Sequence, residues 1–208
     1  MYLNGLCFIT NSKRCSLTSK EIVTFVLRAG VSCIQYREKD KSRRDICREA
    51  LILRKLTNEF GAVLIVNDYT DIALAVNADG VHLGQSDLPI KEARKIVGEE
   101  KIIGISTHNL KQAIEAEKGG ADYIGFGPVF HTKTKNAGAP KGIAMLKEIK
   151  KHVKIPVVAI GGINTENLKS VLDSGADAAA VSSGIIQGDI ADNVIRFLKA
   201  LYSENQIV

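Results

Sequence analysis

The sequence predicts a single α/β domain, residues 1–208, folded as a closed (β/α)8 TIM barrel. Short apolar runs alternate strictly with amphipathic stretches, and this alternation is typical of a parallel sheet covered by helices. Eight such pairs fit into 208 residues, which makes the barrel slightly smaller than usual. No change of composition, Pro-rich linker or low-complexity segment marks a boundary between domains.

Eight apolar runs have the length and composition of strands that are buried on both faces. Each run ends in polar or glycine-rich residues. We expect strands at residues 6–10, 32–37, 62–66, 80–83, 101–105, 123–126, 155–160 and 178–181.

The segments between these runs carry signals for helix starts and stops. Thr18 and Glu21 form a capping box, and Pro89, Asn109 and Asn164 stand where helices begin. Glycines follow the apolar stripes and end the helices. On the buried faces of the first, second and fourth helices we expect Ile22, Phe25, Val26 and Ala29; Ile46, Ala50, Leu53 and Phe60; and Ile90, Ala93 and Ile96.

The main alternative is an open, doubly wound sheet. That fold usually carries a glycine fingerprint directly after its first strand, where the dinucleotide phosphates bind. Here the residues at 10–13 are Thr, Asn, Ser and Lys. The absence of glycine at this turn favours the barrel.

Composition excludes several classes of function. The net charge of +5 and the pI near 9.0 permit an anionic partner, but the basic residues are scattered, so we do not expect nucleic-acid binding. No apolar run approaches the roughly 18 residues of a membrane span, and residues 1–10 do not resemble a signal peptide. Four cysteines without CxxC spacing indicate reduced thiols. We therefore expect a cytoplasmic protein, with Cys7 and Cys33 in the core.

Two carboxylates follow neighbouring strands of the predicted barrel. Asp68 comes two residues after the end of the run at 62–66, and Asp87 follows the run at 80–83. Active sites of such barrels lie at the carboxyl ends of the strands. Two carboxylates there would suit Mg²⁺ together with substrate phosphates. The alternative is that each Asp only caps the helix that follows it.

Cationic side chains follow the second strand. Gln35, Arg37 and Lys39 are spaced two apart, so they share one face, which near the barrel mouth points inward. An inward Arg and Lys are costly unless they meet an anion. In the alternative reading Arg37 pairs with a structural Asp while Lys39 stays in solvent.

The later strands are followed by residues that suit phosphate binding. Ser106 is expected to donate a hydrogen bond, and His108 to help cap the next helix. The long loop at 127–142 carries Thr132, Thr134 and Lys135, a plausible phosphate clamp and lid. Gly161-Gly162 and Ser182-Ser183-Gly184 follow the last two strands, where barrels often bind phosphate. Two anionic substrates, one of them a diphosphate bound with Mg²⁺, predict a transferase.

Ordered motifs over most of the chain resemble the thiamine-phosphate synthase family. They are Gln35-x-Arg37-x-Lys39, Asn67-Asp68, His82-Leu83-Gly84-Gln85-x-Asp87, Ser106-Thr107-His108, Gly127-Pro128-Val129-Phe130-x-Thr132-x-Thr134-Lys135, Ala159-Ile160-Gly161-Gly162-Ile163 and Val181-Ser182. That family joins a hydroxymethylpyrimidine diphosphate to a thiazole phosphate, and releases pyrophosphate.

The resemblance implies a role for each matching residue. Asp68 and Asp87 would ligate Mg²⁺. The pyrimidine diphosphate would be held by Gln35, Arg37, Lys39, Asn67, Ser106 and Lys135, and the thiazole phosphate by Thr132, Thr134, Gly162, Val181 and Ser182. The implied mechanism is dissociative, with Arg37, Lys39, Ser106 and Lys135 as the catalytic residues. Small-molecule substrates are the expected partners, with no nucleic acid and no membrane. The oligomeric state stays open, although barrels of this kind often form homo-oligomers.

A sister family on the same barrel contains thiazole tautomerases, which is the alternative function. The resemblance places their active-site histidine where this chain has Pro128, and this favours the synthase. His131, three positions later, stands where synthases commonly have proline. Tyr36 replaces a usual leucine and is expected to point away from the site.

Overall fold

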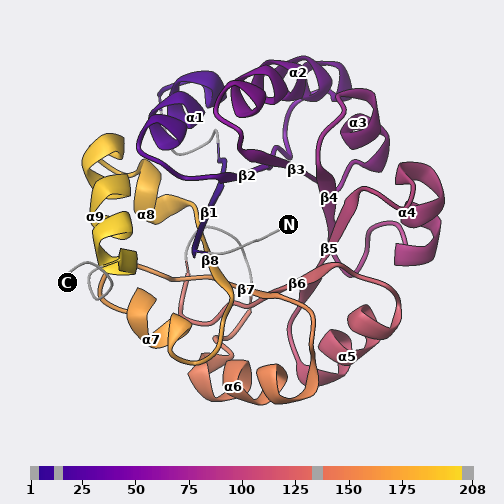
Figure 1. The fold of residues 1–208 in the computed structure, drawn as a ribbon, viewed down its shortest axis with the longest axis vertical. Coiled ribbons are helices and arrows are strands. Elements are labelled where there is room, and N and C mark those ends of the chain that lie inside the picture. Colours follow the sequence, from indigo (N-terminus) through magenta and orange to yellow (C-terminus); the bar gives the residue numbers. More distant parts are fainter. Residues whose placement is uncertain (1–4, 12–15, 133–137, 203–208) are drawn as a thin grey trace.

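The structure of the chain is a computed structural model, and it describes residues 5–11, 16–132 and 138–202. Eight parallel strands form a closed barrel, in which β1 pairs with both β2 and β8. Figure 1 shows the strands as a ring with the helices around it. The strands are β1 (Gly5–Ile9), β2 (Cys33–Tyr36), β3 (Val63–Asn67), β4 (Gly80–Leu83), β5 (Ile102–Thr107), β6 (Tyr123–Phe126), β7 (Val157–Ile160) and β8 (Ala178–Val181). The predicted (β/α)8 barrel is therefore confirmed.

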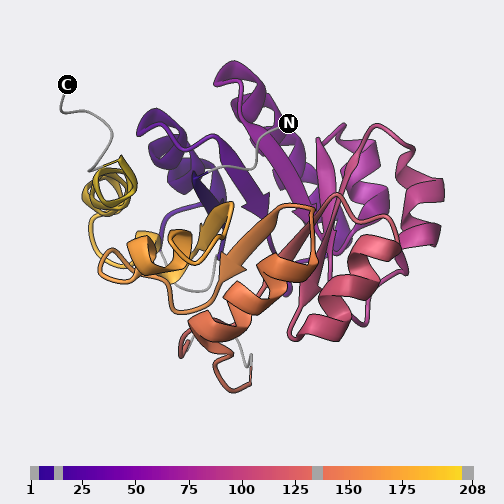
Figure 2. The ribbon, with the colours of Figure 1, turned by 60° about the horizontal axis from the view of Figure 1, so that its bottom comes forward.

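The helices lie outside the strands, as the second view also shows (Figure 2). The described ranges contain α1 (Ser19–Arg28), α2 (Arg43–Glu59), α3 (Thr70–Ala75), α4 (Ile90–Val97), α5 (Leu110–Lys118), α6 (Gly142–His152), α7 (Leu168–Leu172), α8 (Ser183–Ile186) and α9 (Ile190–Tyr202). The short helix α8 follows β8 directly and was not predicted from the apolar pattern, since a single turn has too few residues to show a period.

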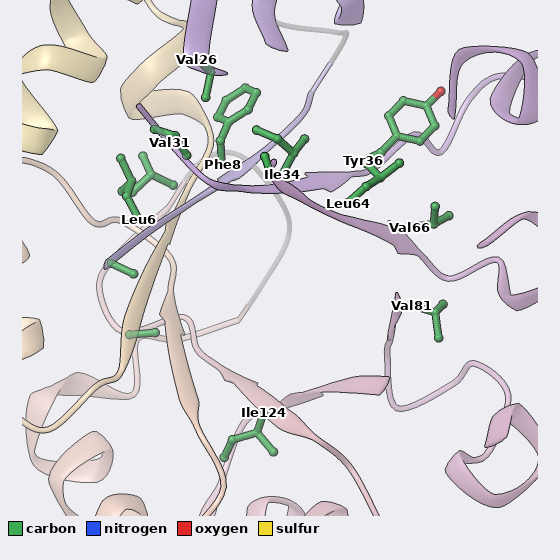
Figure 3. Packing of buried hydrophobic residues seen from close by; sticks show 14 of the residues in the cluster. Leu6, Phe8, Val26, Val31, Ile34, Tyr36, Leu64, Val66, Val81 and Ile124 are labelled. Atoms are coloured by element: carbon green, nitrogen blue, oxygen red, sulfur yellow. The ribbon is translucent and has the colours of Figure 1, made fainter. Parts of the chain in front are cut away.

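Two apolar layers follow from the alternation of side chains along the strands. Phe8, Ile34 and Leu64 point out of the barrel toward the helices, with Val26 of α1 among the residues that meet them (Figure 3). The alternate positions point into the barrel and form a smaller inner cluster. Its buried members are Cys7, Ile9, Cys33, Ile65, Ile102, Tyr123, Val158, Ala178 and Ala180. This inner cluster forms the bottom of the cavity at the carboxyl ends of the strands.

Most predicted helix signals are confirmed. The capping box is present, with the Thr18 hydroxyl accepting from the Glu21 N–H. Asn109 caps α5 by accepting from the Gln112 N–H at 2.9 Å. Pro89 is itself the N-cap of α4 rather than its first residue. Asn164 accepts from two N–H groups of the turn that leads into α7, and the helix itself begins at Leu168.

Three predicted core residues are wrong. The exposed fractions of Phe25, Phe60 and Ile96 are 43%, 44% and 43%. Phe60 is the C-cap residue of α2 and lies beyond its last helical residue, Glu59. Phe25 and Ile96 lie on the sides of their helices, beyond the edge of the buried stripe. In α4 the neighbouring Val97 is buried instead. Within the described ranges no helix is long and apolar enough to cross a membrane.

Candidate active site

Two adjoining cavities open at the carboxyl ends of the strands. The first is lined by residues of all eight strands or the segments that follow them, and the centre of a water molecule can occupy about 160 Å³ of it. The second, with about 200 Å³, lies beside the ends of β2 to β5. Arg37, Asn67, Ser106 and His108 line both. The shared residues make the two cavities one continuous site, at the position predicted for a barrel enzyme.

The second cavity holds the two predicted metal ligands. Asp68 follows β3 directly and has a left-handed backbone with φ 67°, a conformation that Asp tolerates better than most residues. Its N–H donates to the His82 carbonyl at 2.8 Å. Asp87 accepts from the Gly84 N–H at 2.6 Å. Both aspartates line the same cavity, as the sequence predicted.

Asp68 is influenced by burial and by two neighbours. Burial raises the pKa of its carboxyl group, the hydrogen bond from Lys39 lowers it, and the nearby negative charge of Asp87 raises it; the net direction is upward. The two neighbouring carboxylates provide oxygen ligands of the kind that a hard cation prefers. The described residues contain no cluster of three or more His, Cys, Asp or Glu side chains that could hold a metal. Two carboxylates completed by substrate phosphates is an arrangement that Mg²⁺ accepts.

The side chain of Thr10, which follows β1, fixes the backbone at the end of β2. The Thr10 hydroxyl accepts from the Arg37 N–H at 2.9 Å and donates to the Arg37 carbonyl at 3.2 Å. Gln35 is buried and lines the first cavity, Arg37 lines both, and Lys39 lines the second. The three residues predicted to share a face therefore do reach one site. Lys39 also pairs with Asp68.

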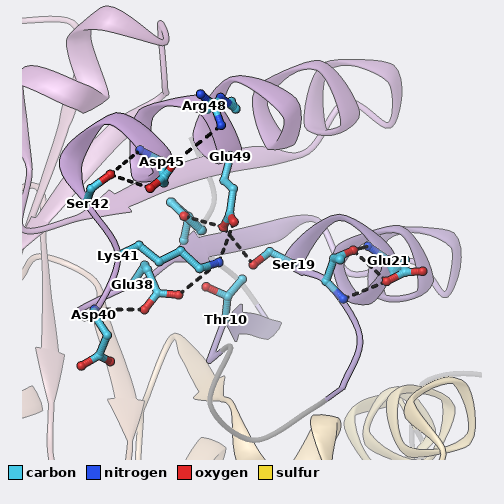
Figure 4. Close-up of polar contacts among 12 residues, drawn as sticks. Thr10, Ser19, Glu21, Glu38, Asp40, Lys41, Ser42, Asp45, Arg48 and Glu49 are labelled. Atoms are coloured by element: carbon cyan, nitrogen blue, oxygen red, sulfur yellow. Dashed lines mark hydrogen bonds and ion pairs between the residues drawn. The ribbon is translucent and has the colours of Figure 1, made fainter.

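A polar network behind β2 anchors the loop that carries Lys39 (Figure 4). The buried Glu38 carboxylate accepts from the N–H groups of Lys39 and Asp40 at 2.9 and 3.2 Å. Lys41 lies 3.6 Å from Glu38 and 2.5 Å from Glu49. We call Tyr36, Glu38, Lys41 and Glu49 the β2 anchor.

Tyr36 belongs to this anchor rather than to the site. Its hydroxyl donates to Glu49 at 2.8 Å, and burial, followed by this carboxylate, raises the pKa of the phenol. The ring packs with the outer apolar layer. The expectation that Tyr36 points away from the site is confirmed.

Ser106 is held by His82, which is held in turn by Tyr123, and neither ring was predicted as part of the site. His82 in β4 bonds to the Ser106 hydroxyl through Nε2 and to the Tyr123 hydroxyl through Nδ1, each at 2.9 Å. Burial raises the pKa of Tyr123 well above its ordinary value, so its phenol stays protonated. Both His82 and Tyr123 line the first cavity.

Glycines make room for these two rings. A Cβ on Gly104 would lie 2.1 Å from the Tyr123 ring, and one on Gly125 would lie 2.9 Å from the His82 ring. A glycine inside a strand indicates that another group approaches closely. That signal was present in the sequence and could have identified His82 and Tyr123.

The prediction that His108 helps to cap the next helix is wrong. Its side chain does not cap α5; Nδ1 lies 2.6 Å from the Gly127 carbonyl, and His108 lines both cavities. A carbonyl can only accept, so Nδ1 carries the proton. The residue that turns toward the start of α5 is Gln112, whose side chain accepts from the His108 N–H at 2.8 Å.

The segment after β6 is tied to the end of β7. The Val129 N–H donates to the Ile160 carbonyl, and the Phe130 N–H donates to the Gly161 carbonyl, each at 2.9 Å. Thr132 lines the first cavity, whereas His131 is exposed and lines neither cavity. The predicted site residues Thr134 and Lys135 lie outside the described residues.

The ends of β7 and β8 complete the first cavity. Gly161 and Gly162 have positive φ angles of 98° and 67°, and a Cβ on either would clash with residues 128–131. Glycine is therefore required for the loop to approach. Val181 and Ser182 line the same cavity, and the buried Ser182 hydroxyl has no hydrogen-bond partner within the described part of the chain. An orphaned hydroxyl beside a cavity is a group that a ligand would satisfy.

Comparisons with known proteins show which family the chain is similar to. The family model described as thiamine monophosphate synthase matches residues 6–185. A thiamine-phosphate synthase of Chloroflexus aurantiacus is 47% identical over 188 residues, covering 90% of this chain and 87% of that protein. One from Clostridium novyi is 53% identical over 170 residues, covering 81% and 83%. A solved structure of thiamine phosphate pyrophosphorylase from Pyrococcus furiosus has a TM-score of 0.88 and 39% identity, covering 96% of each chain. With a family match over most of its length and relatives at this identity and coverage, the chain belongs to the thiamine monophosphate synthase family.

Proposed function

We propose that this transferase joins a hydroxymethylpyrimidine diphosphate to a thiazole phosphate, giving thiamine phosphate and pyrophosphate, with Mg²⁺ as its cofactor. The observation that carries the proposal is that the charged second cavity adjoins the first cavity, which ends in glycines and serines. One half suits a diphosphate, and the other suits a heterocycle that carries a single phosphate.

The charged half is proposed to hold the diphosphate. Arg37 and Lys39 lie beside Asp68 and Asp87, so cations and metal-type carboxylates occur together. Asp68 and Asp87 would hold Mg²⁺, which when bound neutralises charge on the phosphates. Burial, together with the negative charge of Asp87, raises the pKa of Asp68, and a bound cation would favour the ionised carboxylate there.

The pyrimidine is proposed to lie deeper, over the inner cluster. Gln35 and Asn67 are buried and polar, and Ser106 presents a hydroxyl oriented by His82. Such groups are expected to fix the orientation of a heterocycle in a mostly apolar pocket. Lys135 is proposed to reach the diphosphate from the loop after β6.

The thiazole phosphate is proposed to lie at the ends of β7 and β8. Gly162 lets backbone groups approach closely, and Ser182 supplies a hydroxyl that has no partner among the described residues. Thr132, Thr134 and Val181 complete the proposed set. Backbone N–H groups and small hydroxyls at this position are the usual phosphate ligands of such barrels.

The proposed reaction is dissociative. The bond between the pyrimidine methylene carbon and the diphosphate oxygen breaks, and the electron pair leaves with pyrophosphate. The lone pair of the thiazole nitrogen then forms the new carbon–nitrogen bond. No protein nucleophile takes part. Arg37, Lys39 and Lys135 stabilise the charge that grows on the leaving group, and a fixed positive environment of this kind accelerates such steps.

The test is pyrophosphate release measured with both substrates, with each substrate alone, and with and without Mg²⁺. The proposal expects release only when both substrates and the metal are present. Conversion of the thiazole phosphate alone, without metal, would overturn it in favour of the tautomerase. Arg37→Met should lose release, whereas Arg48→Met, an exposed arginine on α2, should retain it.

A further inference from the structure

Two cysteines face each other on the floor of the first cavity. Cys7 of β1 and Cys33 of β2 are register partners on neighbouring strands. Their sulfur atoms lie 3.0 Å apart, with the Cys33 thiol donating to Cys7 Sγ. Both are free, both are buried, and both line the cavity. They therefore form a dithiol that a small solute can reach from the barrel mouth.

The proposed reaction has no use for this dithiol. Sulfur is a poor ligand for Mg²⁺, which prefers oxygen, and the dissociative step needs no nucleophile. The surrounding inner cluster is apolar apart from the Tyr123 hydroxyl. Cys47 lies on α2 outside the barrel, and Cys15 lies outside the described residues. Among the described cysteines, Cys7 and Cys33 are the two that face each other.

The backbone already has the separation that a disulfide needs. Paired strands lie about 4.8 Å apart, and bridged cysteines have Cα atoms about 4.4–6.8 Å apart. The two sulfur atoms would have to move from 3.0 Å to about 2.05 Å. We expect rotation of the two side chains, with a small inward shift of the strands, to cover that difference.

We propose that Cys7 and Cys33 are a modification site, at which a small hydroperoxide converts the dithiol to a disulfide. One thiolate attacks the peroxide oxygen, giving a sulfenic acid and releasing an alcohol, or water from hydrogen peroxide. The second sulfur then displaces the sulfenic hydroxyl, which leaves as water. Two thiols and one hydroperoxide give one disulfide, one water and one alcohol; the sulfurs lose the two electrons that the O–O bond gains.

The thiol of Cys33 is expected to be the less reactive of the two. The hydrogen bond to Cys7 and burial hold the pKa of the Cys33 thiol well above its usual range, and the thiolate is the nucleophile in such reactions. Burial of both thiols within the barrel mouth limits contact with the oxidant, so we expect the change to need sustained exposure. Reduction by a dithiol reagent is expected to reverse the change.

The bridge is expected to alter the pocket above it. Gln35 lies two residues beyond Cys33, on the same face of β2. Formation of the bridge would move the cysteine side chains and so change the shape of the first cavity next to Gln35. A reversible fall in pyrophosphate release follows from this, and this single expectation rests on the proposed function.

The experiment is mass spectrometry of the folded, full-length chain after incubation with hydrogen peroxide. A Cys15→Ser/Cys47→Ser variant should lose the mass of two hydrogen atoms, and its digest should contain the Cys7 peptide joined to the Cys33 peptide. The same variant with Cys33→Ser or Cys33→Ala cannot form the bridge, and circular dichroism establishes that each variant is folded. If the double variant does not fold, the peptide map of the unaltered chain gives the same answer.

Three outcomes would overturn the proposal. They are unreacted thiols after prolonged exposure, conversion to sulfinic acids without a bridge, and disulfides formed between chains. The mass measurement uses no substrate, so it stands even if the transferase assay fails. Conversely, an active transferase whose thiols never join would leave the proposed function intact and remove this inference.

Discussion

The ammonium group of Lys39 forms an ion pair with the carboxylate of Asp68, joining the loop after β2 to the end of β3. Lys39, which is proposed to bind the diphosphate, is thus paired with Asp68, which is proposed to bind the metal. Lys39 is 46% exposed and Asp68 12% exposed, so the lysine is the partner that can move. In the proposed complex the diphosphate would bind Lys39 and Mg²⁺ would bind Asp68, so the ion pair would separate.

Asp68→Asn is expected to lower kcat/KM by about 100-fold or more, because even the outer partners of metal ligands typically matter by about 10- to 100-fold. Asp71→Asn is the matched control, since Asp71 is an exposed carboxylate nearby that pairs with Arg43. Steady-state pyrophosphate release over a range of Mg²⁺ concentrations measures the effect. Full activity in the Asp68 variant would remove the metal assignment.

The same Asp68→Asn change is expected to stabilise the free protein at neutral pH. The folded state raises the pKa of Asp68, so folding disfavours its ionised form. Ionised Asp68 therefore lowers the free energy of unfolding of the wild-type protein at pH values above its folded pKa. This destabilisation disappears below the unfolded pKa of about 3.9, where the carboxyl group is protonated in both states. The advantage of the variant should therefore shrink as pH falls through this window. Urea unfolding of both proteins at several pH values tests it, and a pH-independent difference would contradict the assignment.

Lys41→Met is expected to lower the free energy of unfolding by about 1–3 kcal/mol, because the buried Glu38 carboxylate of the β2 anchor loses its cationic neighbour. The loop that carries Arg37 and Lys39 would loosen. We therefore expect the KM for the pyrimidine diphosphate to rise more than the KM for the thiazole phosphate. Lys147→Met, on the exposed face of α6, should leave both values unchanged. Equal changes in the two KM values would show that the anchor does not position the diphosphate residues.

Ser182→Ala is expected to raise stability and lower affinity at once. The buried hydroxyl has no partner in the described part of the free protein, so its removal should add up to about 1–3 kcal/mol to the free energy of unfolding. The thiazole phosphate should then bind more weakly. Ser170→Ala, which removes an exposed hydroxyl that donates to a carbonyl, should bring no gain in stability. Thermal unfolding with and without the thiazole phosphate separates the two effects.

The barrel could be predicted from the sequence because buried parallel strands and amphipathic helices have different periods. The site could be located because such barrels place it after each strand, where Asp68, Asp87 and Arg37 were found. His82 and Tyr123 were missed because they point inward from within their strands, and only the glycines opposite them gave a signal. His108 was misassigned because Asn109 caps the helix, and the imidazole instead reaches the Gly127 carbonyl after the neighbouring strand β6. Spacing along the chain does not reveal such contacts between strands.

The pairing of β1 with β8 also affects how the chain can fold as it is synthesised. Gly5 lies opposite Ala178, so one neighbour of the first strand is translated only near the end of the chain. Until then β1 has a single partner strand, and the growing sheet presents open hydrogen-bonding edges at β1 and at its newest strand. Pairing over such a long sequence separation slows folding, and unpaired edges favour association between chains. Closure of the ring removes both edges in one late event.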